Sequence, residues 1–169
     1  MQTLPDYPCH AGGMLIVGIN PSPVSVACGH YFQGRLGKRL WTRLQEHGLL
    51  EPSVPGEEDL AFVAAGNGLT DLVKRPTARA HELTAKELAN GVASLKAKIR
   101  LWRPGLILFV YRPPAECLLG KENVRPGRCA DLNDCSTFLL AGPYASAAET
   151  LRVYAELRQL LKARIAAVK

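Results

Sequence analysis

The residue best suited to chemistry in this sequence is Asn20, which stands in the turn Gly18-Ile19-Asn20-Pro21. A side-chain amide carries both a hydrogen-bond donor and an acceptor, so it can orient a water molecule without changing its charge. The turn follows the apolar run 14–17, which is typical of a strand buried on both faces. Ligands of open α/β sheets bind beyond the carboxyl ends of the strands, so a site is expected here. An isolated Asn-Pro pair, however, is more often only a turn former.

Backbone and aromatic groups near this turn could hold a planar ligand. The amides of Gly18 and Ile19 lie where a strand ends, and they could donate to a ligand carbonyl unless the turn satisfies them internally. Phe32 offers a ring face on which a planar ring can stack, with Tyr31 as the second choice. A single phenylalanine beside an apolar run is more often a core residue, so both interpretations of Phe32 stay open.

The length and net charge of the chain limit the classes of protein to which it can belong. The chain has 169 residues, 47% of them hydrophobic, which predicts one globular domain over residues 1–169. The formal charge of +6 favours an anionic partner, most often nucleic acid, although many basic proteins are simply basic. We treat four cations near the expected site as candidates for phosphate contact, each of which taken alone is more often a solvated charge. They are Lys38, Arg39, Lys74 and Arg75.

The five cysteines are scattered, and none has the Cys-x-x-Cys spacing of a zinc or redox site. We therefore expect free thiols in a reducing cytoplasm, and no metal. The first residues are polar and interrupted by Pro5 and Pro8, which argues against a signal peptide. The sequence predicts a cytoplasmic protein with a loosely held leader over residues 1–12.

The elements that must position Asn20 alternate between strands and helices. Strands are expected at 14–19, 106–111 and 137–140, and a short strand or extended segment at 68–75, with helices between them and a long loop over 20–34. Thr84 and Ser146 each precede a glutamate at capping-box spacing, and the closing helix is expected to bury its face down to Ile165. The alternation predicts an α/β fold with a parallel sheet and helices on both faces.

Three segments of this chain form a pattern: 18–21 read Gly-Ile-Asn-Pro, 29–32 read Gly-His-Tyr-Phe and 38–41 read Lys-Arg-Leu-Trp. Together they resemble the first signature of the mismatch-specific branch of the uracil-DNA glycosylase superfamily. A second block, 68–77, matches the family in spacing and character. The resemblance covers most of the chain. It implies a three-layer α/β/α sandwich with a central, mainly parallel four-stranded sheet.

The resemblance also implies an activity: a monofunctional, monomeric DNA glycosylase that removes uracil, or a related damaged pyrimidine, without a cofactor. Asn20 would place the water, Phe32 would stack on the flipped base, and the last loop would fill the gap in the DNA. The family usually has glycine at position 22. Ser22 would add a Cβ to the pocket wall and disfavour thymine, unless its hydroxyl only caps the turn.

The last signature departs from the family. Residues 141–146 read Ala-Gly-Pro-Tyr-Ala-Ser where Asn-Pro-Ser-Gly is usual. Gly142, Pro143, Tyr144 and Ser146 still precede a helix N-terminus that could approach a phosphate. Tyr144 would either act as a wedge or pack against the closing helix. Two alternatives therefore remain: a nucleic-acid-binding relative that lost turnover, and an enzyme acting on free nucleosides.

Overall fold

The computed structural model describes residues 2–167 and contains one five-stranded sheet with strand order β2-β1-β3-β5-β4. Four strands are parallel, which confirms the predicted sheet, and the two-residue edge strand β4, which the sequence did not predict, pairs antiparallel with β5. The strands are β1 (Met14–Gly18), β2 (Gly68–Asp71), β3 (Leu106–Phe109), β4 (Gly127–Arg128) and β5 (Ser136–Leu139).

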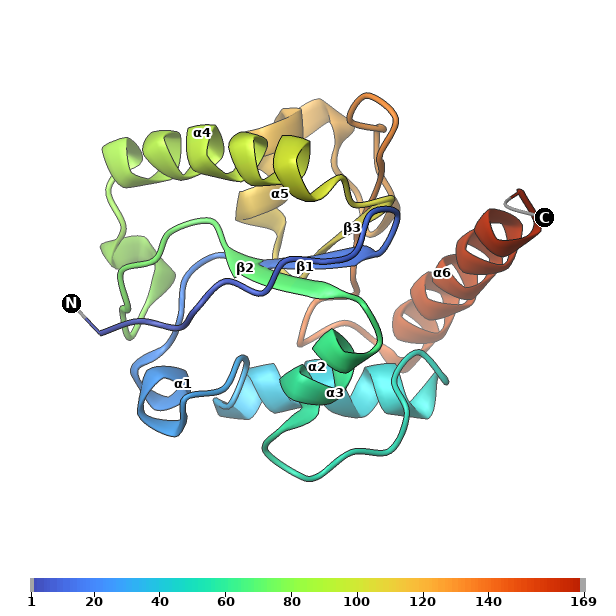
Figure 1. Cartoon of the computed structure of the whole chain (residues 1–169), viewed down its shortest axis with the longest axis horizontal. Helices are drawn as coiled ribbons and strands as arrows, with labels where there is room; N and C mark the ends of the chain where they lie inside the picture. Colours follow the sequence, from blue (N-terminus) through green and yellow to red (C-terminus); the bar gives the residue numbers. More distant parts are fainter. Residues whose placement is uncertain (1, 168–169) are drawn as a thin grey trace.

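Helices cover both faces of the sheet and make three layers (Figure 1). Helices α4 and α5 lie on one face, and α2, α3 and α6 pack on the other. The helices are α1 (Pro23–Cys28), α2 (Arg35–Glu46), α3 (Glu58–Ala64), α4 (Ala85–Trp102), α5 (Arg112–Leu119) and α6 (Ala147–Ala167). Within residues 2–167, none of them is long and apolar enough to cross a membrane.

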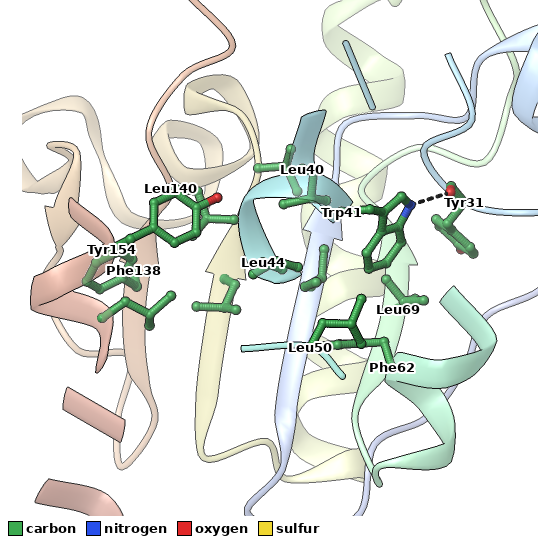
Figure 2. Packing of buried hydrophobic residues seen from close by; sticks show 14 of the residues in the cluster. Tyr31, Leu40, Trp41, Leu44, Leu50, Phe62, Leu69, Phe138, Leu140 and Tyr154 are labelled. Carbon is green, nitrogen blue, oxygen red and sulfur yellow. Dashed lines mark hydrogen bonds between the residues drawn. The ribbon is translucent and has the colours of Figure 1, made fainter. Parts of the chain in front are cut away.

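Two apolar clusters, one on each face of the sheet, hold the layers together. Along β1, Leu15 and Val17 belong to the cluster beneath α4 and α5, whereas Ile16 belongs to the other. This alternation follows from the two-residue period of a strand, and it explains why the run 14–17 is apolar throughout. Figure 2 shows the second cluster, where Trp41 of α2 donates its indole N–H to the Tyr31 carbonyl at 3.0 Å.

The predicted helix starts are confirmed at α4 and α6. Thr84 accepts from the Glu87 amide at 3.2 Å and Glu87 bonds back to Thr84, as a capping box requires. Ser146 accepts from the Glu149 amide at 3.1 Å. The expectation for Ile165 is wrong, because this residue near the end of α6 is 63% exposed. The last turns of α6 extend past the sheet, so no opposite layer remains to bury them (Figure 1).

The loop predicted over residues 20–34 contains helix α1. Ser22 caps it, accepting from the Ser25 amide at 3.2 Å, and Gly29 ends it with a left-handed φ of 75°. Six residues are too few to be stable as an isolated helix, so these end contacts and the packing of the turn maintain it. The same loop therefore holds a rigid element directly after Asn20.

The N-terminal segment is not the loosely held leader that was predicted. Tyr7 and Leu69 exchange two backbone hydrogen bonds of 2.9 Å, which add the segment to the edge of β2. Asp6 forms ion pairs with Lys74 at 2.9 Å and Lys98 at 2.7 Å. Leu4 is 2% exposed. These partners come from distant parts of the chain, so local sequence gave no sign of them.

Candidate active site

A cavity of about 280 Å³ lies at the carboxyl ends of β1 and β2, where the sequence predicted a site. Four of the predicted site residues line it: Asn20, Ser22, Tyr31 and Phe32. Residues that the sequence did not single out complete the wall. They are Leu4, Pro21, Ser25, Gly34, Arg35, Leu36, Gly37, Asp71, Ala78 and Tyr111.

The Asn20 side chain is held in one orientation. Its amide nitrogen donates to the Arg75 carbonyl at 2.9 Å and to Thr77 Oγ1 at 2.8 Å. A carbonyl oxygen can only accept, so the nitrogen must face Arg75 and the amide cannot be reversed. Oδ1 has no hydrogen-bond donor among residues 2–167. The Oδ1 atom of Asn20 is therefore left as a hydrogen-bond acceptor at the cavity, whereas the amide N–H groups are already bonded to the protein.

Gly18 and Ile19 do not line the cavity, although they adjoin it. Their carbonyls accept from the amides of Leu72 and Val73, each at 2.9 Å, which ties the turn to the residues after β2. The Ile19 side chain packs into the core beneath α4. A role for the two backbone amides toward a ligand stays a prediction.

Phe32 is strained in a way that supports a role in the site. Its φ of 57° is left-handed, which is unusual for a bulky residue, and such strain tends to occur at functional sites. Gly37 of α2 makes the conformation possible, because a Cβ there would lie 2.6 Å from the Phe32 carbonyl carbon and oxygen. The ring is partly exposed in the cavity and stands 5.8 Å from those of Tyr31 and Trp41.

Tyr31 packs behind the cavity wall and exposes little of its side chain. It is 1% exposed, and its hydroxyl donates to the Pro5 carbonyl at 2.9 Å. Its amide donates at 2.8 Å to Asp59, a fully buried carboxylate that also holds His30 Nδ1 at 2.9 Å. Sequence reasoning did not single out Asp59, because its partners lie almost 30 residues away.

Asp71 is the main site residue that sequence reasoning missed. It ends β2, opposite Gly18 in the register, and is 2% exposed. Its Oδ2 is buried with no hydrogen-bond partner in the described chain. Burial raises the pKa of this carboxyl to about 7, and the Asp6 carboxylate adds to the shift against the lowering effect of Lys74 and Lys98.

Ser22 caps helix α1 and also lines the cavity. Its Oγ caps α1 and lies 3.0 Å from Ser25 Oγ, as a turn-capping serine would. The residue also lines the cavity, so its Cβ and the ligand space are neighbours. Whether that contact disfavours a methylated base stays a prediction.

The four cationic side chains proposed to contact phosphate differ in whether they are already paired with a carboxylate. Lys38 and Arg39 are exposed on α2, whereas Lys74 is paired with Asp6 and also donates to the Tyr31 hydroxyl at 3.1 Å. Arg75 binds both carboxylate oxygens of Glu87, at 2.5 and 3.0 Å. Ion pairing neutralises the last two cations, so Lys38 and Arg39 are the stronger candidates for phosphate contact.

The loop 142–146 is tied to α2 by two arginines. Arg39 donates to the Pro143 carbonyl at 2.7 Å, and Arg43, which was not predicted, donates to the Gly142 carbonyl at 2.9 Å. Tyr144 is 75% exposed, with the Arg39 guanidinium 6.0 Å from its ring centre. Of its two predicted placements, packing against the closing helix is wrong.

Metal-binding geometry is not found in this region. Across residues 2–167, no three His, Cys, Asp or Glu side chains gather where they could hold a metal ion. The polar side chains that line the cavity are an amide, hydroxyls, one buried carboxyl and the Arg35 guanidinium, and aromatic rings stand beside them. Such a set suits a planar, hydrogen-bonding ligand.

Comparison with known proteins agrees with this geometry. A family model described as "Uracil DNA glycosylase superfamily" matches residues 5–168. The chain is also 33% identical over 114 residues to a protein from Schizosaccharomyces pombe named "G/U mismatch-specific uracil DNA glycosylase". That alignment covers 65% of this chain and 34% of the relative, so the chain matches about a third of the relative's length.

Proposed function

Because the chain belongs to the uracil DNA glycosylase superfamily, we propose that it hydrolyses the N-glycosidic bond of flipped-out uracil in DNA. The observation that carries this proposal is the fixed Asn20 amide, which lines the same cavity as Phe32, a residue with a strained backbone. A glycosylase needs both elements: a platform for the base and a group that places water.

The reaction separates an anionic base from a sugar with oxocarbenium character, and water then adds to the sugar. A water molecule that donates one O–H to Asn20 Oδ1 keeps a lone pair for this attack. The amide nitrogen is held by Thr77 and the Arg75 carbonyl, so the acceptor is oriented before the substrate arrives. No proton transfer to Asn20 is required, because the proton that water loses on adding to the sugar neutralises the anionic base that has left.

DNA would approach the exposed side of α2 and the loop after β5. Lys38 and Arg39 supply positive charge there, and Tyr144 projects where a side chain can fill the space left by a flipped base. We expect the protein to act as a monomer.

The direct test is excision from uracil-containing oligonucleotides, single-stranded and paired with guanine or adenine, followed by alkaline cleavage of abasic sites. Cleavage at the uracil supports the proposal. Binding of uracil-containing DNA without cleavage would favour the alternative, a relative that lost turnover, for which the altered loop 141–146 is the motivating feature. Release of base from free deoxyuridine alone would favour a nucleoside hydrolase.

Replacing Ser22 tests the discrimination between uracil and thymine. We expect Ser22→Gly to narrow the preference for uracil over thymine opposite guanine, because removing Cβ makes room for the 5-methyl group; one methyl is worth roughly 10- to 200-fold. Rates on the two mismatches measure the ratio. Ser22→Ala is the matched control, since it keeps Cβ and loses only the cap. An unchanged ratio in active Ser22→Gly protein would assign Ser22 to capping alone.

Replacing Phe32 tests the stacking platform. We expect Phe32→Ala to weaken binding of DNA carrying a hydrolysis-resistant uracil analogue by about 1–3 kcal/mol, the usual contribution of a base stack. Phe32→Leu fills similar space without a π face, so it should restore stability but not affinity. If both variants bind the analogue as the parent does and remain folded, Phe32 is a core residue.

A further inference from the structure

The loop 142–146, which carries the exposed Tyr144, is held only weakly by its own backbone. Within the described residues, its one internal backbone hydrogen bond joins the Ala145 amide to the Gly142 carbonyl at 3.0 Å. A Cβ added at Gly142 would meet no atom within 4 Å, so close packing does not fix the loop at that residue. An open groove of about 500 Å³ lies between the loop and α2. Contacts from outside the loop must therefore determine where Tyr144 stands.

Two arginines of α2 reach the loop across this groove. Arg43 Nη1 donates to the carbonyl oxygens of Ala141 and Gly142 at 3.1 and 2.9 Å. Arg39 Nη1 donates to the Pro143 carbonyl at 2.7 Å. Three consecutive carbonyls thus accept from two guanidinium groups that lie about one helical turn apart. Hydrogen bonds from a charged donor are stronger than those between neutral groups, so these contacts outweigh the single bond inside the loop.

The two arginines differ in what else they can contact. Arg39 is exposed, and its guanidinium has five N–H donors of which one is used for Pro143, so it can hold the loop and a phosphate together. Arg43 is half-buried, and both of its hydrogen bonds among the described residues go to the segment 141–142. Arg43 is therefore placed to hold the loop rather than to meet DNA.

We propose that Arg43 is a positioning residue, which fixes the loop 142–146 so that Tyr144 stands where it can fill the gap left by a flipped base. The inference rests on the proposed function, because it takes flipped-out uracil as the substrate. Extruding a base costs most in a paired and stacked duplex and least in a single strand. The contribution of Arg43 should therefore be large for uracil in duplex DNA and small for uracil in single-stranded DNA.

Arg43 could instead attract DNA through its charge, and the two roles make different demands on the side chain. A phosphate contact serves single and double strands alike, and lysine can replace arginine as a point charge. Holding two neighbouring carbonyls depends on the planar guanidinium, whose donors point in fixed directions. The type of DNA and the type of cation therefore separate the two roles.

The test compares single-turnover excision of uracil opposite guanine with excision from the same strand without its complement. We expect Arg43→Gln to slow the duplex reaction about 10-fold, the worth of a hydrogen bond from a charged group, and the single-strand reaction by less than about 3-fold. Arg43→Lys should lie between the parent and Arg43→Gln on the duplex. Arg158→Gln is the matched control, because half-buried Arg158 contacts His47 Nδ1 of the α2 C-cap at 3.1 Å and does not hold the loop. It should keep the duplex-to-single-strand ratio of the parent.

A double-mutant cycle shows whether Arg43 acts through Tyr144. Tyr144→Ala alone should slow the duplex reaction, because no ring then fills the gap. Adding Arg43→Gln to Tyr144→Ala should cost little more, since the loop no longer carries the group that Arg43 positions. Fold-losses that multiply would mean that the two residues act independently, and they would overturn the inference.

Equal slowing of both reactions by Arg43→Gln, or the full parent rate of Arg43→Lys on the duplex, would make Arg43 a phosphate contact and overturn the inference. An unchanged duplex rate in Arg43→Gln would also overturn it. If thermal unfolding shows that Arg43→Gln is not folded, Arg43→Lys takes its place in the cycle. If the parent excises no uracil from either DNA, the proposed function fails. Affinities for duplex and single-stranded DNA with the hydrolysis-resistant uracil analogue then decide on Arg43 by the same comparison.

Discussion

The Asn20→Ala variant is expected to excise uracil about 10²-fold more slowly than the parent, or slower still, while its affinity for uracil-containing DNA changes by only a few-fold. Water placement acts mainly in the transition state, so its loss lowers the rate of the chemical step and leaves ground-state binding nearly intact. Single-turnover excision and binding of the hydrolysis-resistant analogue separate the two quantities.

The Asn20→Asp variant is the matched comparison for Asn20→Ala. It keeps an acceptor but loses the N–H donor that binds the Arg75 carbonyl and Thr77, so the acceptor is no longer fixed. Thermal unfolding of both variants controls for damage to the turn. Excision by Asn20→Ala at the parent rate would remove Asn20 from the mechanism.

The Asp71→Asn variant is expected to be more stable than the parent, increasingly so at alkaline pH. The unfolded chain releases this proton near the ordinary pKa of 3.8, whereas the folded chain holds it up to about 7. The folded state therefore binds more protons between these values, and parent stability falls as pH rises through that window. Asparagine does not titrate, so the advantage of the variant grows by about 3 kcal/mol between pH 5 and 8.

Thermal unfolding at pH 5 and pH 8 measures this difference. At about 2–4 °C per kcal/mol for a chain of this size, the gain in Tm at pH 8 should exceed that at pH 5 by roughly 6–12 °C. Asp134→Asn, on the exposed segment before β5, removes the same charge and should show no such trend. Equal gains at the two pH values would mean that Asp71 titrates in the folded protein as it does in the unfolded chain.

The strands and the Asn20 turn could be predicted because their signals are local. The run 14–17 is apolar at every position, as a strand with helices on both faces must be, and the turn follows it directly. Thr84 and Ser146 mark the starts of their helices, because each side chain bonds the backbone amide only three residues further along the chain.

Asp71 and Asp59 could not be assigned from the sequence, because their environments depend on pairings between distant segments. Asp71 is buried only when β2 lies beside β1, and Asp59 meets Tyr31 only when α3 packs under the sheet. The same reason applies to Lys74 and Arg75, whose carboxylate partners lie 68 and 12 residues away.

Short elements also escaped prediction. Helix α1 has six residues, two of them valines with low helix propensity, and β4 has two residues. Tertiary contacts maintain both, so neither leaves a periodic pattern in the sequence. The left-handed φ of Phe32 is equally invisible, since it depends on the close approach of Gly37.

The N-terminal segment links ligand binding to the colloidal behaviour of the protein. β2 is an outer strand of the sheet, and the paired backbones of Tyr7 and Leu69 shield its open hydrogen-bonding edge. An unshielded edge is a template for strands of other molecules. The same segment places Leu4 in the cavity wall. Detachment of the segment from β2 would therefore open the cavity and also expose an aggregation-prone strand edge. We therefore expect solubility and ligand binding to depend on the same few backbone hydrogen bonds.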